Sequence, residues 1–292
     1  MTKATPSDHA AILQQAIVNG ALPGDGGGID ENTAPSIARF IVQVANIRAK
    51  GASIVDIDAE KDGKPSSATM RIAIINDDMP FLVDSIANCL AQLGIEIHCL
   101  AHPVMAVERD LSDRLLSIAP TARGDASRES MIYLEADWIN AKKRQQLVRE
   151  LLKTLAHVRA AVTDWPGLQA ALQADAENTS DAEGAALLLW LLERHMTQTG
   201  YERRNRAGAA TQALGICRID SEPILAPATI EAAFAWFDKG GCIPLIIKSN
   251  CASRVHRGTL LDVFIVPVRE DGAVVALSVH AGMWTSTALA TA

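Results

Sequence analysis

The spacing of hydrophobic residues between positions 35 and 75 predicts a helix followed by a strand. In residues 35–50 the apolar side chains recur every three or four positions, so they would form one buried stripe on a helix. These positions are Ile37, Phe40, Ile41, Val44 and Ile47. Residues 68–75 alternate instead and are rich in Ile, which is typical of a strand.

A second helix is expected directly after this strand. Asp78 is placed to cap its N-terminus, and Pro80 suits its first turn because proline has no N–H to leave unbonded. Gly94 marks its end. The apolar stripe of this helix consists of Leu82, Ile86, Leu90 and Leu93.

The following residues complete a regular alternation of strands and helices. The order β-α-β-β-α-β is the ferredoxin-like arrangement, in which two helices cover one face of an antiparallel sheet. We therefore expect an α+β domain over residues 35–172, with residues 1–34 as a flexible N-terminal segment. The remaining strands of this domain are predicted over residues 95–107, 131–136 and 158–163, and its second helix over residues 140–156.

The chain beyond residue 172 predicts a second, smaller α+β domain. Residues 173–180 are polar and typical of a linker, so we place a boundary there and the second domain over residues 181–292. Its pattern is a helix over residues 181–195 followed by a mostly antiparallel sheet. The strands are expected near residues 200–204, 214–218, 244–248, 259–268 and 273–279, with a short helix over 230–237.

Composition and charge narrow the classes of function. The 292 residues are enough for two hydrophobic cores. A net charge of −7 argues against a nucleic-acid binder and against attraction to an anionic membrane. No apolar run is long enough to span a bilayer, and no signal-peptide core is present, so we expect a cytoplasmic location. The five cysteines are odd in number and lack CxxC spacing, which favours free, mostly buried thiols.

Few residues are arranged in a pattern that suggests catalysis or metal binding. His98 and His102 have the even spacing that would place two imidazoles on one face of a strand, but no further zinc ligands lie nearby, so ordinary strand histidines are favoured. Cys251 and His256 lack an activating pattern around them. The glycine-rich residues 24–28 do not have the spacing of a phosphate-binding loop. We therefore predict no catalytic set and no metal site.

The turn before the second helix is the remaining candidate site. Exposed N–H groups at a helix N-terminus attract carboxylates, and Asn76 and Asp77 could receive an amino group, so a small acidic ligand such as an amino acid would fit. The alternative is a purely structural turn in which Asp77 and Asp78 serve as caps. The candidate residues are Asn76, Asp77, Asp78, Met79, Pro80 and Phe81.

Several segments together resemble one family, the large multidomain NAD-specific glutamate dehydrogenases of bacteria. The run IINDDMPFLVDS at residues 74–85 is similar to the first ACT-type domain of these enzymes. Further matching segments are residues 94–98, 101–104, 129–131, 189–192 and 200–201. A second block resembles a PAS-like domain of the same enzymes and comprises residues 247–250, 253–257, Asp262 and 284–286.

The resemblance implies a regulatory or assembly region rather than a catalytic one. The parent enzymes deaminate L-glutamate to 2-oxoglutarate with NAD, but the catalytic lysine and dinucleotide loop of the family lack counterparts here, so no cofactor is expected in this chain. Implied partners are other domains of such an enzyme, a second copy, or an amino-acid effector. Phe81 stands where amino-acid-binding ACT domains place a glycine, and a bulky ring there would hinder approach of a ligand.

The sequence does not assign a role to the motif residues of the second block. These residues are Lys248, Ser249, Asn250, His256 and Arg257. The alternative to a region of a dehydrogenase is a free-standing ACT/PAS-like sensor of a small molecule, such as an amino acid.

Overall fold

The computed structural model divides the chain into two compact units, residues 1–155 and 156–292. It describes residues 5–20, 29–59, 69–120, 127–219 and 223–285. The division falls inside helix α4 (Ala141–Thr163), whereas the sequence suggested a linker at residues 173–180. Within the described residues no helix is both long enough and apolar enough to cross a membrane.

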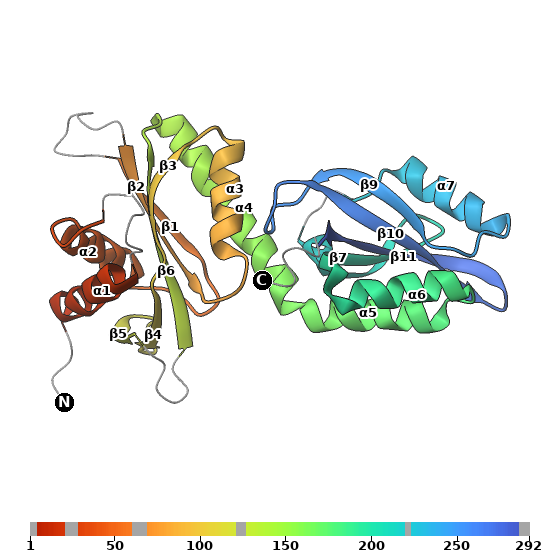
Figure 1. Ribbon diagram of the computed structural model, residues 1–292, viewed down its shortest axis with the longest axis horizontal. Helices are drawn as coiled ribbons and strands as arrows, with labels where there is room; N and C mark the ends of the chain where they lie inside the picture. Colours follow the sequence, from red (N-terminus) through yellow and green to blue (C-terminus); the bar gives the residue numbers. More distant parts are fainter. Residues whose placement is uncertain (1–4, 21–28, 60–68, 121–126, 220–222, 286–292) are drawn as a thin grey trace. The chain divides into compact units, whose positions relative to one another are not determined.

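The first unit contains an antiparallel sheet in the order β1-β2-β6-β4-β5, in which β3 also pairs with β6 (Figure 1). Strands β3 and β4 are successive segments along one edge of β6: Ala101 pairs with Tyr133, and Val104 pairs with Ser130. The single strand predicted over residues 95–107 is thus interrupted at His102 and Pro103. The strands are β1 (Ile54–Asp58), β2 (Thr69–Asp77), β3 (Ile97–Ala101), β4 (Val104–Arg109), β5 (Leu115–Ala119) and β6 (Ser127–Asp137).

Helices cover both faces of this sheet. Figure 1 shows α1 (Pro6–Gly20) and α2 (Ala34–Ala45) on one side, and α3 (Leu82–Gln92) and α4 on the other. Because strand residues alternate between faces, Ala73 and Ile75 join the core beneath α1 and α2, and Ile72 and Ile74 face the other way. The buried Leu13 of α1 belongs to this first core.

Two predictions for this unit are wrong, and one strand was not predicted. Residues 6–20 form a helix with a buried face, not a flexible segment. Residues 158–163 continue helix α4 rather than forming the last strand. Strand β1, which the sequence does not predict, forms the edge of the sheet beside β2, where Ile54 pairs with Ile75. The ferredoxin-like order therefore lacks its final strand, and a strand from earlier in the chain stands in the corresponding place.

The second unit is a five-stranded antiparallel sheet in the order β8-β7-β11-β10-β9. All five expected strands and the short helix are present, with shifted ends. The strands are β7 (Met196–Asn205), β8 (Ala210–Gly215), β9 (Leu245–Ala252), β10 (Leu260–Glu270) and β11 (Ala273–Trp284). The helical segments are α5 (Trp165–Asn178), α6 (Ala182–Trp190), a π-helical turn (Leu191–His195), a 3₁₀ turn (Ile216–Arg218) and α7 (Pro227–Asp238).

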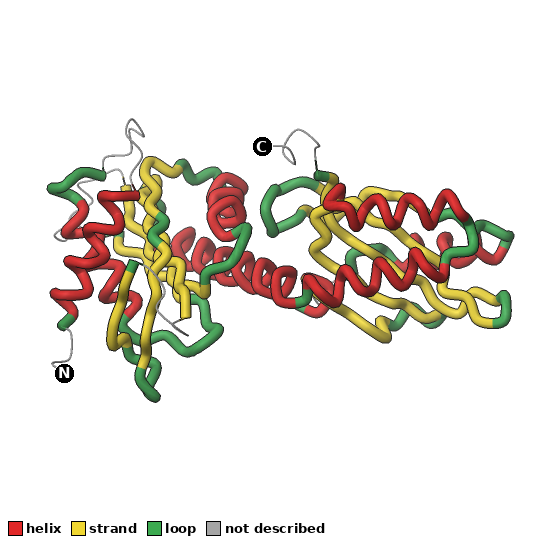
Figure 2. Tube along the Cα trace, turned by 60° about the horizontal axis from the view of Figure 1, so that its bottom comes forward, coloured by secondary structure: helices red, strands yellow, loops and turns green. Residues whose placement is uncertain are grey.

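Helices α5 and α6 lie along one side of this sheet (Figures 1 and 2). Leu172 and Ala176 of α5 pack with Leu188 of α6 and with Phe264 and Val266 of β10. The residues expected to form a polar linker, 173–180, therefore lie mostly within α5, and this prediction is wrong.

A buried polar contact also joins α5 to the sheet. His280 is fully buried, and its Nε2 lies 2.7 Å from Oδ2 of Asp175. The amide of Gln198 lies 3.0 Å from the other ring nitrogen, Nδ1. Since an amide N–H can only donate, the ring accepts at Nδ1 and donates from Nε2 to the carboxylate.

Candidate functional site

The turn at residues 76–81 joins the end of β2 to the start of α3. Phe81 stands at the N-cap with a φ of 70°, in the left-handed region. That backbone conformation is unusual for a large side chain, because its Cβ crowds the neighbouring carbonyl oxygen. The Phe81 side chain makes no capping hydrogen bond, and its carbonyl accepts a 2.5 Å hydrogen bond from the Ser85 hydroxyl. The prediction that Asp78 caps this helix is therefore wrong.

Asn76, a candidate to receive the amino group of a ligand, is fully buried. Its Oδ1 accepts a hydrogen bond of 2.7 Å from the Ser53 hydroxyl, and its Nδ2 donates one of 2.8 Å to the Asp77 carbonyl. A buried amide that already has partners at both its oxygen and its nitrogen fixes the turn rather than receiving a ligand.

Asp77 belongs to a buried network of charges. Arg48 is 2% exposed and reaches Asp77 at 2.7 Å and Glu129 at 2.8 Å. Arg109 binds both oxygens of the same Glu129, each at 2.8 Å, in the forked geometry that suits guanidinium and carboxylate. Arg48 also donates to the Ala52 carbonyl at 2.8 Å. This network connects the segment after α2 to the ends of β2, β4 and β6.

Asp78 belongs to a second group of polar side chains. Its Oδ1 accepts a hydrogen bond of 3.0 Å from the Ser130 hydroxyl, and Arg128 lies 3.0 Å from its Oδ2. His102 Nε2 lies 2.9 Å from the same hydroxyl. Because Ser130 uses its proton on Asp78, His102 donates from Nε2. Burial lowers the pKa of His102, and the nearby Asp78 carboxylate offsets part of that effect.

Contacts within the protein thus hold both acidic side chains of the turn, Asp77 and Asp78. Met79 is half-buried and Pro80 is exposed, so they complete the turn at the surface. The sequence indicates the turn and includes Glu129 in a family motif, but it does not reveal the roles of Arg48 and Arg109. An arginine directly after an apolar helical stripe was the available signal for Arg48.

The motif residues of the second unit surround the connection from β9 to β10. Lys248 pairs with Asp262 at 2.6 Å, and the buried Ser249 hydroxyl donates to the Ile224 carbonyl at 2.8 Å. Arg257 donates to the Trp284 carbonyl at 2.6 Å. Asn250 is exposed, and His256 has a left-handed backbone with a φ of 62°. These contacts hold the connection and the end of β11 together.

The two histidines that the sequence suggested as a pair bind different partners. His98 binds Asp137 at 2.9 Å, whereas His102 binds Ser130. All five cysteines are free, and Cys89 and Cys99 are the two buried ones. Burial, with help from Glu135, raises the pKa of Cys99 to about 11. Within the described residues, no three side chains of the metal-binding types gather.

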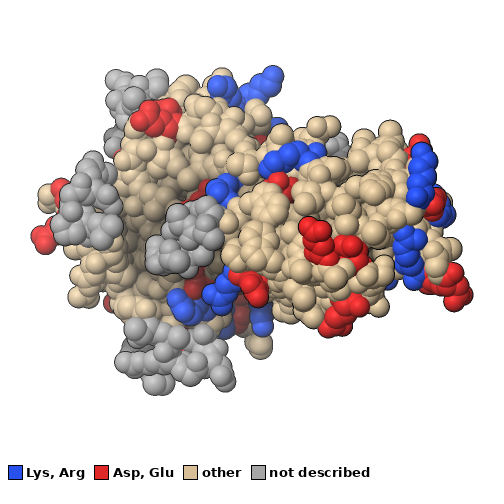
Figure 3. Space-filling model, turned by 45° about the vertical axis from the view of Figure 1, so that its right-hand side comes forward, with Lys and Arg blue, Asp and Glu red and all other residues tan. Residues whose placement is uncertain are grey.

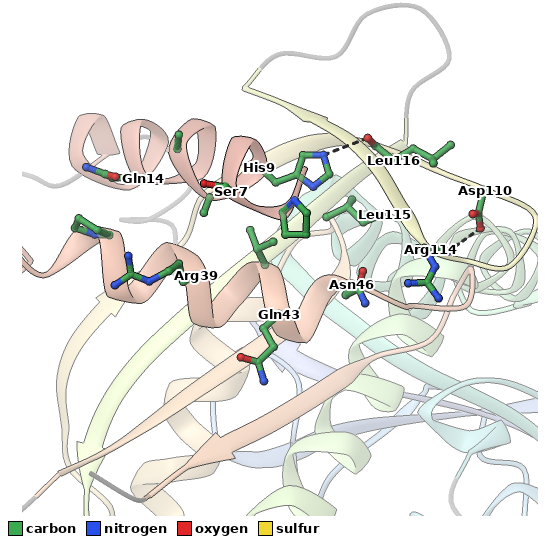
Figure 4. Close-up of a pocket in the computed structure, with 15 residues that line it drawn as sticks. Ser7, His9, Gln14, Arg39, Gln43, Asn46, Asp110, Arg114, Leu115 and Leu116 are labelled. Atoms are coloured by element: carbon green, nitrogen blue, oxygen red, sulfur yellow. Dashed lines mark hydrogen bonds between the residues drawn. The ribbon is translucent and has the colours of Figure 1, made fainter. Parts of the chain in front are cut away.

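A groove in the first unit was not anticipated from sequence. It has a volume of about 760 Å³ and runs between α1, α2 and the β4–β5 hairpin (Figure 4). His9 of α1 connects this helix to the hairpin through a contact of 3.1 Å to the Leu116 carbonyl.

Figure 3 shows acidic and basic side chains interspersed on the face it draws, rather than one basic patch.

Comparison with known proteins places these features in a family. Residues 29–151 match the family model described as the ACT1 domain of glutamate dehydrogenase. The NAD-specific glutamate dehydrogenase of Halomonas elongata is 30% identical over 283 residues, which cover 86% of this chain and 17% of that enzyme. The enzyme of the same name from Pseudomonas aeruginosa is 34% identical over 169 residues, covering 52% of this chain and 10% of that enzyme.

A third relative agrees with these two. The NAD-specific glutamate dehydrogenase of Mycobacterium tuberculosis is 27% identical over 190 residues, covering 59% of this chain and 12% of that enzyme. The first unit thus contains the segment, residues 29–151, that matches the ACT1 domain, and its mixed α+β fold is compatible with that match. The chain is a relative of the NAD-specific glutamate dehydrogenases, and the resemblance seen in its motifs is confirmed. It spans less than a fifth of the length of the relatives it matches.

Proposed function

We propose that this chain is a non-catalytic regulatory and assembly region of an NAD-dependent glutamate dehydrogenase. In the complete enzyme, L-glutamate would be deaminated to 2-oxoglutarate, and NAD would bind outside this chain. The observation that carries the proposal is the ACT1 match over residues 29–151. The geometry supports it, because the candidate turn directs Asp77 and Asp78 to arginines of the protein itself.

The second unit would serve the same role as a PAS-like domain. Its antiparallel sheet with helices packed along it supports this assignment, as does the contact network that holds Lys248, Ser249 and Arg257. Such a region acts either by binding differently to two states of the enzyme or by packing subunits together.

An activity assay tests the non-catalytic part of the proposal. The purified 292-residue chain is incubated with L-glutamate and NAD, and NADH formation is followed by absorbance, with a complete NAD-specific glutamate dehydrogenase as the positive control. We expect no NADH above the background without protein. Turnover by the isolated chain would overturn the proposal.

A second measurement separates this proposal from a free-standing sensor. An antibody raised against the chain is used to probe extracts of the source cells. A band far larger than the 31.1 kDa of this sequence supports a region of a larger enzyme. A band at 31.1 kDa would favour the free-standing sensor and overturn the proposal.

A further inference from the structure

The groove between α1, α2 and the β4–β5 hairpin contains two arginine side chains that have no partner in the part of the chain that the structure describes. Arg39 of α2 and Arg114 of the hairpin both line it. Among the described residues, neither guanidinium makes a hydrogen bond or ion pair. Figure 4 shows them well separated along the groove, with Gln43 and Asn46 of α2 between them.

The remaining lining has the mixed character of a small-molecule site. The side chains of Ser7, Gln14, Gln43 and Asn46 also have no hydrogen-bond partner among the described residues, so each is available to a ligand. The buried Val42 and Leu115 supply apolar surface in the same groove. Ligand pockets typically combine such apolar surface with a few convergent polar groups, in volumes of about 300–1,000 Å³.

One acidic residue lies beside these cations. Asp110 accepts hydrogen bonds from the backbone N–H groups of Ser112, at 2.8 Å, and Arg114, at 3.0 Å. Its carboxylate therefore closes the hairpin turn. Two arginines against this one acid leave the groove net positive, in a chain whose overall charge is −7.

We propose that this groove binds a small organic dianion, with one carboxylate at Arg39 and the other at Arg114. A guanidinium recognises a carboxylate through paired N–H donors, so two separated guanidiniums favour a ligand with an acidic group at each end. The amides of Gln43 and Asn46 bond polar groups between the two ends. This inference concerns the groove alone and does not depend on the proposed function.

Calorimetric titration of the chain with succinate tests the inference. Succinate has a carboxylate at each end and no other charge. We expect binding in the micromolar to millimolar range, weakened about ten-fold or more, or about 1.4 kcal/mol, by Arg39→Gln and by Arg114→Gln separately. Propionate, which has one carboxylate, should bind more weakly than succinate.

Two variants complete the design. Arg149→Gln removes an exposed arginine on α4 outside the groove, so it should bind succinate like the parent. Ala11→Trp fills the groove from an exposed position of α1 and keeps both arginines, so it should abolish binding. Circular dichroism melting shows that each variant is folded.

Three outcomes would overturn the inference. The first is no succinate binding at about 10 mM, a concentration at which even a weak specific site is occupied. The second is unchanged binding in both arginine variants. The third is equal binding of propionate and succinate, because a site for two carboxylates must distinguish them.

Discussion

Glu129 is the residue on which Arg48 and Arg109 converge, and its loss would remove the carboxylate that binds Arg109 and leave Arg48 with Asp77 alone. Glu129 is 1% exposed, and Arg48 and Arg109 are 2% and 11% exposed. Breaking a buried ion pair from one side costs about 3–5 kcal/mol, because the remaining charge stays desolvated. We therefore predict that Glu129→Gln lowers the free energy of unfolding by about this amount, measured by urea denaturation.

Asp238→Asn is the matched control for this prediction. Asp238 pairs with Arg206 at 2.6 Å, but both side chains are more than 40% exposed. Solvent screens such a pair, so the variant should unfold almost like the parent. Equal effects of the two substitutions would contradict the stabilising role assigned to the buried network.

His102 gives the first unit a dependence on pH. Burial lowers its pKa below the ordinary value of about 6.5, so the folded state favours the neutral ring. A lowered pKa means that this stability is complete above pH 6.5 and is lost as the pH falls through the folded-state pKa. We predict that the stability difference between the parent and His102→Gln shrinks as the pH is lowered from about 7.5 to 5.

Urea denaturation of both proteins across this pH range measures the difference. Asp78 and Arg128 are the charged groups beside His102 that remain in both proteins, so their own effects largely cancel. A gap that widens towards acid pH would contradict the assigned direction of the pKa shift.

Sequence predicted the turn residues but not their partners. Asn76 to Phe81 stand out because polar residues and a proline precede an apolar stripe. What each carboxylate contacts depends on distant residues: Arg48 lies 29 positions from Asp77 and 81 from Glu129. Local patterns do not contain such pairings, so the sequence suggested either caps or a ligand site and did not reveal the ion pairs that Asp77 and Asp78 form.

At the scale of elements, the apolar stripe of α3 carries a quantitative prediction. Leu90 is fully buried, as is Ile86, whereas Leu93 is only half-buried. Leu90→Ala removes buried methyl groups and leaves a cavity, so it should lower the free energy of unfolding by about 2–5 kcal/mol. Leu152→Ala on α4 is the control, since Leu152 is 39% exposed and should cost about 0.5 kcal/mol. A cost for Leu90→Ala no greater than that of the control would contradict this packing.

The misassigned elements have a physical explanation. Three of the six residues 158–163 are Val or Thr, which favours a strand on local grounds. The buried residues Leu147, Leu151, Leu155 and Val158 nevertheless continue a spacing of three and four, so packing extends α4 through them. Strand β1 is short and contains two aspartates, and its pairing with β2 decides its conformation. Tertiary contacts thus override local preference at both places.

At the scale of the whole molecule, the proposed assembly role predicts self-association. Each sheet ends in edge strands, β1 and β5 in the first unit and β8 and β9 in the second. An edge strand presents backbone groups that can pair with another chain. Near β9 the apolar Ile243, Ile246 and Leu260 are 47–49% exposed, which makes this edge the one best suited to pairing.

We predict that the chain forms dimers or larger species, measured by sedimentation velocity over a range of concentrations. Ile246→Lys places a charge on the exposed side of β9 and should shift the chain towards monomer without lowering its melting temperature, because charged edge residues oppose strand pairing. Leu111→Lys alters an equally apolar but fully exposed residue in the β4–β5 connection and should leave association unchanged. A parent chain that stays monomeric at high concentration would contradict the assembly part of the proposed function. Regulation by a bound ligand would then be the only role left in the proposal.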